Sequence, residues 1–150
     1  MDLILWRHAE ADDGRSDLAR ELTARGRKHA ARAAAWLLQR LPSSFTVLAS
    51  PAERTQQTAL ALGVPFETVQ CLAPGASVSE ILTAAEWPDR TGVVIVVGHQ
   101  PGLGHVAASL LSGKADSWTI KKGGLWWFTN RVRNDEAQIV LRAVIEPDLL

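Results

Sequence analysis

The sequence has few of the features of a secreted or membrane-bound protein. Its 150 residues include a single cysteine, Cys71, which cannot form an internal disulfide, so a reducing compartment is expected. No run of about 18 apolar residues predicts a membrane span, and the apolar N-terminal stretch stops at Arg7 without a preceding basic region, unlike a signal peptide. Sixteen basic and sixteen acidic residues give a net charge of zero, which favours neither nucleic acid nor a membrane as a partner. We therefore expect a cytoplasmic protein.

Several catalytic signatures are also missing from the sequence. It contains no Gly-x4-Gly-Lys-Ser/Thr loop of the P-loop NTPases, and no His-Glu-x-x-His or Cys-x-x-Cys pattern that would indicate a metal site. A cysteine-based phosphatase needs the pattern Cys-x5-Arg, but Ser77 stands at the arginine position that follows Cys71. The sequence therefore predicts neither a metal nor a cofactor.

The order of apolar and helical patterns predicts one α/β domain over residues 1–150. Short apolar runs, typical of buried strands, alternate with stretches that repeat apolar residues at helical spacing. This alternation is typical of a mostly parallel central sheet with helices on both faces. The expected strands cover 3–6, 46–49, 66–69, 93–97, 124–129 and 137–142, and the expected helices cover 23–40, 50–63, 77–87 and 101–113.

Capping residues mark two of the expected helix starts. Ser50 at the N-cap, Pro51 at the first helical position and Glu53 three residues after the cap form a capping-box pattern. The pattern predicts a helix directly after the preceding strand. Ser77 and Glu80 repeat it for a later helix.

Two histidines follow buried strands. Arg7 and His8 come directly after the first apolar segment, and Gly98 and His99 come directly after the segment at 93–97. In open α/β sheets the ligand crevice lies just outside the carboxyl ends of the strands. Arg54 lies near the start of a helix that also follows a strand. We therefore expect two histidines and two arginines to converge on one crevice.

This combination of side chains suits the binding of a phosphoryl group and attack upon it. A guanidinium is planar and permanently charged, so it can bind phosphate oxygens two at a time. A histidine, with an ordinary pKa near ~6.5, can act as a neutral nucleophile or as a charged donor. Its attack on phosphorus would form a covalent phosphohistidine. The residues alone leave open whether His8 or His99 is the nucleophile.

Three motifs occur in a fixed order along the chain: Arg7-His8 after an N-terminal strand, Ser50-Pro51-x-x-Arg54 followed by Gln57-Thr58-Ala59, and Gly98-His99 after a late strand. The ordered set resembles the histidine phosphatase superfamily, whose fold is that of the phosphoglycerate mutase-like proteins, over nearly the whole chain. The resemblance implies that His8 is the phosphorylated nucleophile. It also implies that Arg7, Arg54 and His99 form the phosphate pocket.

Within this superfamily the chain resembles the small SixA-type phosphohistidine phosphatases. It shares their short length without an inserted cap segment, and Arg20-Glu21-Leu22-Thr23 is similar to their Arg-x-Leu-Thr. The resemblance implies that Arg20 lines the edge of the pocket. It further implies a protein substrate that carries phosphohistidine, such as a phosphotransfer domain. One departure is Ala9, which stands where the superfamily commonly has glycine.

The general acid of related enzymes has no clear counterpart. Gln100 follows His99, where acid phosphatases of the superfamily have an aspartate, and Glu80 is the remaining candidate. The spacing of Glu80 from Ser77 favours helix capping over acid catalysis. A phosphoester needs a proton for its alkoxide leaving group, whereas a protonated imidazole departs as a neutral molecule. The lack of a clear acid therefore favours phosphohistidine as the substrate.

Two alternatives to this function remain open. One is a phosphatase of small phosphomonoesters, and the other is a phosphate- or nucleotide-binding module without catalysis. Residues 102–107 match the Gly-x-Gly-x-x-Ala pattern of a dinucleotide site. Against that site, Pro101 already begins the helix, and Lys121 and Lys122 stand where the ribose-binding acid is expected.

Overall fold

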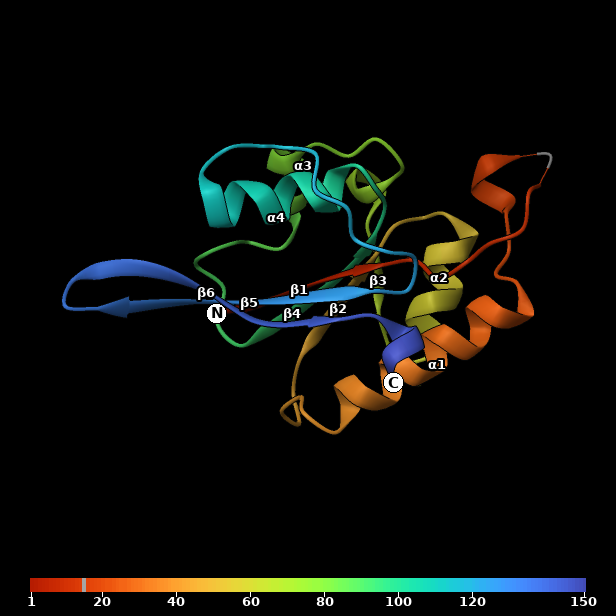
Figure 1. The fold of residues 1–150 in the computed structure, drawn as a ribbon, viewed down its shortest axis with the longest axis horizontal. Helices are drawn as coiled ribbons and strands as arrows, with labels where there is room; N and C mark the ends of the chain where they lie inside the picture. The colour runs from red at the N-terminus through yellow and green to blue at the C-terminus, as the bar shows by residue number, and fades with distance from the viewer. Residues whose placement is uncertain (15) are drawn as a thin grey trace.

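The computed structural model describes residues 1–14 and 16–150, which form a six-stranded sheet with helices on both faces (Figure 1). The strand order is β3-β2-β4-β1-β5-β6, with parallel pairing from β3 to β1 and antiparallel pairing from β1 to β6. The strands are β1 (Asp2–Arg7), β2 (Thr46–Ala49), β3 (Glu67–Thr68), β4 (Val93–Gly98), β5 (Leu125–Arg133) and β6 (Glu136–Ile145). The predicted α/β architecture is therefore confirmed.

The helices divide between the two faces of the sheet. Figure 1 shows α3 and α4 together on one side, and α1 and α2 on the other. The four helices are α1 (Ala24–Leu38), α2 (Glu53–Leu60), α3 (Val78–Ala84) and α4 (Gly102–Ser112). The described residues also include three short 3-10 helices: η1 (Asp17–Ala19), η2 (Gln70–Leu72) and η3 (Pro147–Leu149).

The central strands are buried on both faces, which explains their continuous apolar sequences. Successive side chains of β1 point to opposite faces. Ile4 and Trp6 pack with residues of α1 and α2, whereas Leu3 and Leu5 pack with residues of α3 and α4. The sheet therefore separates two apolar layers, and the helices that cover them are held against it from both sides.

The strand register places the two histidines side by side. β1 pairs in parallel with β4, and Arg7 lies opposite Gly98. The backbone N–H of His8 then donates to the carbonyl of Gly98 at 3.1 Å, and that of Ser50 donates to the carbonyl of Val97 at 3.1 Å. The chain therefore leaves β1, β2 and β4 at one common edge of the sheet, as expected for a ligand crevice of this fold.

One expected helix start is wrong. α2 begins at Glu53 with Ala52 at its N-cap, and Ser50 does not cap it. The Ser50 hydroxyl accepts from the backbone N–H of Ala52 at 3.3 Å and also contacts His99, so its capping capacity is used before the helix begins. The two other caps are confirmed: Thr23 accepts from the backbone N–H of Gly26, and Ser77 forms a full capping box with Glu80.

The C-terminal hairpin is longer than its apolar pattern indicates. The expected strands at 124–129 and 137–142 extend to Leu125–Arg133 and Glu136–Ile145, and Asn134 and Asp135 form the turn as expected. Figure 1 shows the tip of this hairpin projecting beyond the rest of the sheet. Its outer residues have only one partner strand, so no buried face imposes an apolar alternation on them.

Two glycines permit close backbone contacts that hold the site loops in place. A Cβ atom at Gly26 in α1 would lie 2.0 Å from the carbonyl oxygen of Glu10, in the loop after His8. A Cβ atom at Gly104 in α4 would lie 1.8 Å from the carbonyl oxygen of Trp118. Only glycine allows either approach without a shift of the backbone.

No described helix is long and apolar enough to cross a membrane.

Candidate active site

The ring of His8 is fixed with its Nε2 atom toward the other site residues. His8 is the first residue after β1, and its Nδ1 atom lies 2.7 Å from the carbonyl oxygen of Ala9. That contact assigns the ring N–H to Nδ1, because the carbonyl can only accept. The lone pair of Nε2 then points at Arg54, whose Nε donates to it at 3.3 Å. His8 is therefore held as the tautomer that a nucleophile at Nε2 requires.

The segment after His8 is tied to α2. The backbone N–H of Ala9 donates to the Thr58 hydroxyl at 3.1 Å, and that hydroxyl donates to the carbonyl of Arg54 at 2.7 Å. Among the described residues, positive φ at residues other than glycine occurs at Glu86, Asn134 and Asp135. Ala9 therefore needs no glycine-like backbone, and the departure from the common glycine carries no strain.

Arg54, in the first turn of α2, lies between the two histidines. Its Nε contacts His8 and its Nη2 lies 3.3 Å from Nδ1 of His99. The ring centroids of the two histidines are 5.3 Å apart. Only 4% of Arg54 is exposed, so its charge is little screened by solvent.

His99 is fixed from its other side by Ser50. The Nε2 atom of His99 lies 2.7 Å from the Ser50 hydroxyl, which is fully buried. Because Nδ1 of His99 faces the guanidinium of Arg54, it carries the lone pair, and Nε2 donates to Ser50. Ser50 is therefore a positioning residue for His99. Its place in a capping-box pattern had indicated a different role, as the N-cap of α2.

Arg7 completes the set from the end of β1. Its Nη1 donates to the carbonyl of Ile120 at 2.8 Å, while its Nε is buried and has no hydrogen-bond partner among the described residues. A buried donor without a partner is uncommon in proteins, and this N–H is left free to donate to a ligand. The structure thus brings His8, Arg7, Arg54 and His99 together, as the sequence predicts.

Gln100 supports the loop that holds Arg7. Its side-chain amide accepts from the backbone N–H of Gly104 at 2.9 Å and donates to the carbonyl of Trp118 at 2.8 Å. The same loop supplies the Ile120 carbonyl to Arg7. Gln100 stands where acid phosphatases of the superfamily have an aspartate. In this chain it holds the backbone of Gly104 and Trp118 together by hydrogen bonds.

Burial and positive charge determine the protonation of both histidines. Burial, together with the charges of His99, Arg54 and Arg7, lowers the pKa of His8 to about 3, against the opposing effect of the Ala9 hydrogen bond. Burial and the charge of Arg54 lower the pKa of His99 to about 4. Burial and Arg54 also lower the pKa of Arg7. The free site therefore holds two neutral imidazoles beside cationic groups, which favours an anionic ligand.

The lowered pKa values predict how the two histidines titrate. Protonation of either ring in the folded protein is expected only below about pH 5, well under the ordinary histidine pKa of ~6.5. Both rings bind protons more readily when unfolded, so the free energy of unfolding is expected to fall as the pH drops below ~6.5. Imidazole resonances followed by NMR across pH 4 to 8 measure this. Midpoints near ~6.5 for both site histidines would contradict the prediction.

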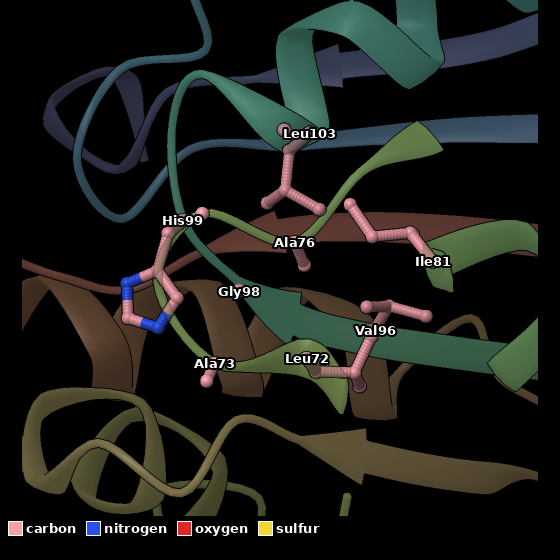
Figure 2. A pocket seen from close by; sticks show the side chains of 10 residues that line it. Leu72, Ala73, Ala76, Ile81, Val96, Gly98, His99 and Leu103 are labelled. Atoms are coloured by element: carbon pink, nitrogen blue, oxygen red, sulfur yellow. The ribbon is translucent and has the colours of Figure 1, made fainter. Parts of the chain in front are cut away.

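A small apolar pocket lies behind His99. Its volume is about 10 Å³, room for no more than about one water molecule. Figure 2 shows apolar side chains such as Leu103, Ile81 and Val96 clustered in it, with the His99 ring directed away from them. This pocket supports the backbone around His99 and is too small for a substrate. The candidate ligand position is instead the polar space between the histidines and arginines.

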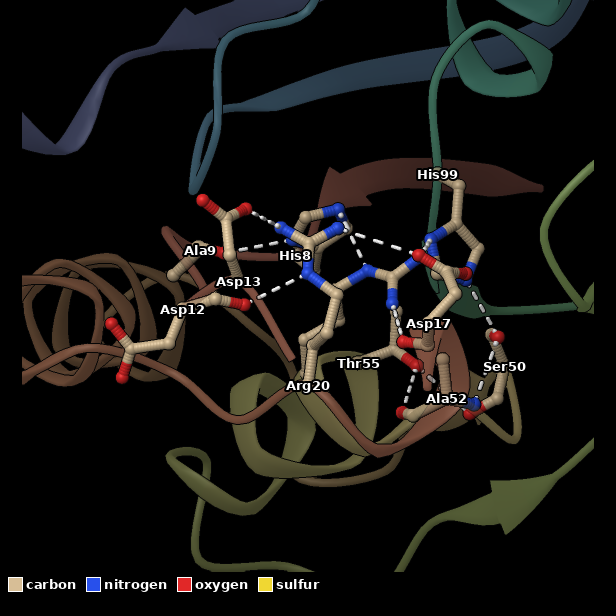
Figure 3. A network of polar contacts seen from close by, with 11 residues as sticks. His8, Ala9, Asp12, Asp13, Asp17, Arg20, Ser50, Ala52, Thr55 and His99 are labelled. Carbon is tan, nitrogen blue, oxygen red and sulfur yellow. Dashed lines mark hydrogen bonds and ion pairs between the residues drawn. The ribbon is translucent and has the colours of Figure 1, made fainter. Parts of the chain in front are cut away.

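Arg20 lies at the edge of this polar space, and Glu80 does not join the network. Arg20 donates to the carbonyl of Asp12 at 2.8 Å and pairs with Asp17, which in turn contacts Arg54 (Figure 3). The Glu80 carboxylate accepts from the backbone N–H and the hydroxyl of Ser77 at 2.8 and 2.9 Å. These bonds lower the pKa of Glu80, so its geometry favours capping over acid catalysis.

Asp17 and Thr58 also contact the site residues, and their sequence positions alone do not indicate these contacts. Asp17 lies in a polar loop with no periodic pattern, and its contact with Arg54 joins positions that are far apart in the chain. Thr58 belongs to the segment after Arg54, so its place in the ordered motifs was the available signal. The hydrogen bonds of Asp17 and Thr58 to the site form only in the folded protein, because they join segments that are far apart in the chain.

Packing explains the glycines of the dinucleotide-like pattern. A Cβ atom at Gly102 would lie 2.6 Å from the carbonyl oxygen of Ala76, and one at Gly104 would meet Trp118. Both glycines therefore let α4 approach the protein's own backbone. Close packing of α4 therefore explains why residues 102 and 104 are glycine, without a bound nucleotide.

Comparison with known proteins agrees with this fold. The model of the histidine phosphatase superfamily (branch 1) matches residues 3–73. An uncharacterized protein of Picosynechococcus sp. is 35% identical over 140 residues, which cover 83% of this chain and 82% of the relative. A Nakamurella multipartitia structure assigned as phosphohistidine phosphatase SixA has a TM-score of 0.80 at 29% identity, covering 97% of this chain and 95% of that one.

A second solved structure extends the likeness of fold. The protein histidine phosphatase SixA complexed with tungstate has a TM-score of 0.83 at 24% identity, with 99% of both chains covered. The fold is therefore that of the phosphoglycerate mutase-like proteins. The chain belongs to the histidine phosphatase superfamily, branch 1.

Proposed function

We propose that this protein is a metal-independent phosphatase that acts on phosphohistidine in a protein and passes the phosphoryl group through His8. The observation that carries the proposal is the Nε2 lone pair of His8, which faces a buried guanidinium and a second imidazole. Because the pKa of His8 is lowered to about 3, this lone pair is available at neutral pH. The proposed nucleophile therefore needs no separate base to deprotonate it.

In the first step, Nε2 of His8 attacks phosphorus and the bond from phosphorus to the leaving group breaks. The guanidinium groups of Arg7 and Arg54 neutralise the charge on the phosphoryl oxygens. The neutral ring of His99, held by Ser50, lines the pocket and keeps Nη2 of Arg54 in position. The hydrogen bond from Nδ1–H to the Ala9 carbonyl persists, so phosphorylated His8 is an imidazolium. That cationic ring is in turn a good leaving group.

In the second step, water attacks the phosphorus of phosphorylated His8. The bond between phosphorus and Nε2 breaks, its electron pair returns to Nε2, and dihydrogen phosphate is released. His8 returns to the neutral ring with its proton on Nδ1. Every proton is accounted for, because the water keeps both of its protons on the departing phosphate.

The lack of a placed general acid supports phosphohistidine as the substrate. Glu80 is committed to its capping box, and Gln100 replaces the aspartate of the acid phosphatases. A phosphoester releases an alkoxide that needs a proton, whereas a protonated phosphohistidine releases neutral imidazole. The likeness to SixA phosphohistidine phosphatases, and an open groove of about 340 Å³ next to Arg7, also support a protein substrate.

Turnover by the purified protein, with a chelator present, tests the proposal. The substrates are a histidine-phosphorylated phosphotransfer domain, phosphoserine and p-nitrophenyl phosphate. We expect kcat/KM for the phosphohistidine protein to exceed that for phosphoserine by at least about 10²-fold, the size of a general-acid effect. Activity should be the same with and without the chelator.

Each other outcome identifies a different function. Faster turnover of phosphoserine would favour a phosphatase of small phosphomonoesters. No turnover of any substrate, together with phosphate binding, would favour a binding module. Loss of activity on metal removal that returns on metal addition would contradict the metal-independent mechanism.

A further inference from the structure

Asp17 reaches the candidate active site from the loop between β1 and α1. It is the first residue of η1, and its carbonyl accepts from Nη1 of Arg54 at 2.6 Å. Its carboxylate accepts from Nη2 of Arg54 at 3.2 Å and from Nη1 of Arg20 at 3.4 Å. Figure 3 shows Asp17 beside His99 in this network. A carboxylate is thus held at the mouth of a site built to bind an anion.

The Asp17 carboxylate lies beside the phosphoryl position and leaves that position free. One edge of the Arg54 guanidinium, formed by Nε and Nη2, faces the lone pairs of His8 and His99 at 3.3 Å each. The end formed by Nη1 and Nη2 faces Asp17. A phosphoryl oxygen can therefore take the N–H groups of the first edge while Asp17 retains the other end.

The charge on Asp17 is available to a ligand. Among the described residues, the charged and titratable groups that face it are Arg54 of α2, Arg20 of its own loop and His99 after β4. Partial burial raises the pKa of Asp17, but the hydrogen bonds and charges of Arg54 and Arg20 outweigh it, and the net pKa is lowered. The side chain is 57% exposed, so its remaining lone pairs are open to a group that enters the site.

We propose that the Asp17 carboxylate accepts a hydrogen bond from the free ring N–H of the substrate's phosphohistidine, and thereby makes the site select phosphohistidine over phosphate esters. This inference rests on the proposed function. The bound phosphoryl group adds negative charge next to the Asp17 carboxylate, so a leaving group that brings positive charge is favoured there. The protonated ring of phosphohistidine is such a leaving group, and an alcohol is not.

The proposed contact acts on the bond that breaks. The substrate ring carries phosphorus on one nitrogen and a proton on the other, and Asp17 stabilises this cationic form. As Nε2 of His8 bonds to phosphorus, the electron pair of the old bond returns to the substrate nitrogen. The ring leaves as neutral imidazole with its proton still on the far nitrogen. Asp17 therefore keeps the leaving group protonated without giving up or taking a proton.

The same carboxylate disfavours esters. An ester oxygen gains negative charge as its bond to phosphorus breaks, and a nearby carboxylate opposes that charge. Selectivity thus comes from an attractive contact with one leaving group and a repulsive one with the other.

Substitution D17N tests the proposal, with phosphohistidine protein and p-nitrophenyl phosphate as the two substrates. Asparagine still presents an oxygen to Nη2 of Arg54, so any effect through Arg54 falls on both substrates. The ratio of kcat/KM for phosphohistidine to that for the aryl ester is expected to fall about tenfold to a hundredfold, as for loss of a hydrogen bond to a charged group. The alkaline limb of the phosphohistidine pH profile should also move to lower pH.

Two matched variants complete the test. D17E keeps the charge and is expected to recover part of the ratio. D12N removes a carboxylate from the same loop. Asp12 contacts Arg20 and Glu21 through its backbone, so these contacts do not depend on its side chain. The ratio for D12N should therefore equal that of the wild type.

Equal losses on both substrates in D17N would overturn the proposal, because Asp17 would then act only by positioning Arg54. An unchanged ratio would overturn it as well. If the wild type hydrolyses the aryl ester but not phosphohistidine, the proposed function fails and this inference fails with it. If the wild type is active on phosphohistidine and D17N keeps its ratio, only this inference fails.

Discussion

Replacement of His8 by asparagine is expected to reduce turnover of every substrate by at least about 10³-fold, the scale on which loss of a nucleophile acts. The lone pair on the amide nitrogen of asparagine is delocalised into its carbonyl group, so this nitrogen cannot attack phosphorus. The surrounding arginines and His99 remain in place, so binding of inorganic phosphate should persist. Steady-state kcat/KM and phosphate binding by calorimetry measure the two effects separately.

A phosphoenzyme assay identifies the nucleophile directly. Wild-type protein mixed with a ³²P-labelled substrate should carry an acid-labile label, and H8N should carry none. H105N is the matched control, because His105 lies in α4 outside the network of the site. Turnover by H8N at the wild-type rate, or label located on His99, would contradict the assignment of His8.

Replacement of Arg54 by lysine is expected to lower kcat/KM by about 10²- to 10³-fold, the cost of removing one preorganised donor from a transition state. Lysine keeps the charge but offers a single nitrogen, whereas Arg54 contacts His8, His99 and Asp17 through three. The Nε and Nη2 edge that faces the phosphoryl position is therefore lost. Pre-steady-state formation of the phosphoenzyme shows whether the first step is the one affected.

The control for this variant is R32K on the exposed side of α1, which should behave as the wild type. Thermal unfolding of R54K shows whether the variant remains folded, since Arg54 is buried and its replacement affects packing. A folded R54K that retains kcat/KM within about threefold of the wild type would show that charge alone suffices, against the expected role of the guanidinium fork.

Much of the fold was predictable because its signals are local. The apolar runs of β1, β2 and β4 span few residues, and their burial on both faces follows from that composition. The caps at Thr23 and Ser77 were predictable for the same reason, since each involves residues within one helical turn. The Ser50 cap was wrong because a distant residue, His99, competes for the same hydroxyl.

The convergence of the four motif residues was also predictable. Arg7 and His8 end one strand, and His99 follows another, so a parallel pairing of the two strands is enough to bring them together. What remained open was the nucleophile. The structure adds that the Ala9 carbonyl holds the His8 ring with its Nε2 lone pair inward, whereas Ser50 holds His99 through Nε2.

The sequence by itself determined the order of strands and helices, the edge of the sheet where the candidate site lies and the motif residues gathered there. These depend on the period of apolar residues and on the direction of the chain at strand ends. Only the tertiary structure decided the ring tautomers, the support of Arg7 through Gln100 and Ile120, and the place of Asp17 on Arg54. Those contacts join residues far apart in the chain, and they form only when the packed helices fix the loops.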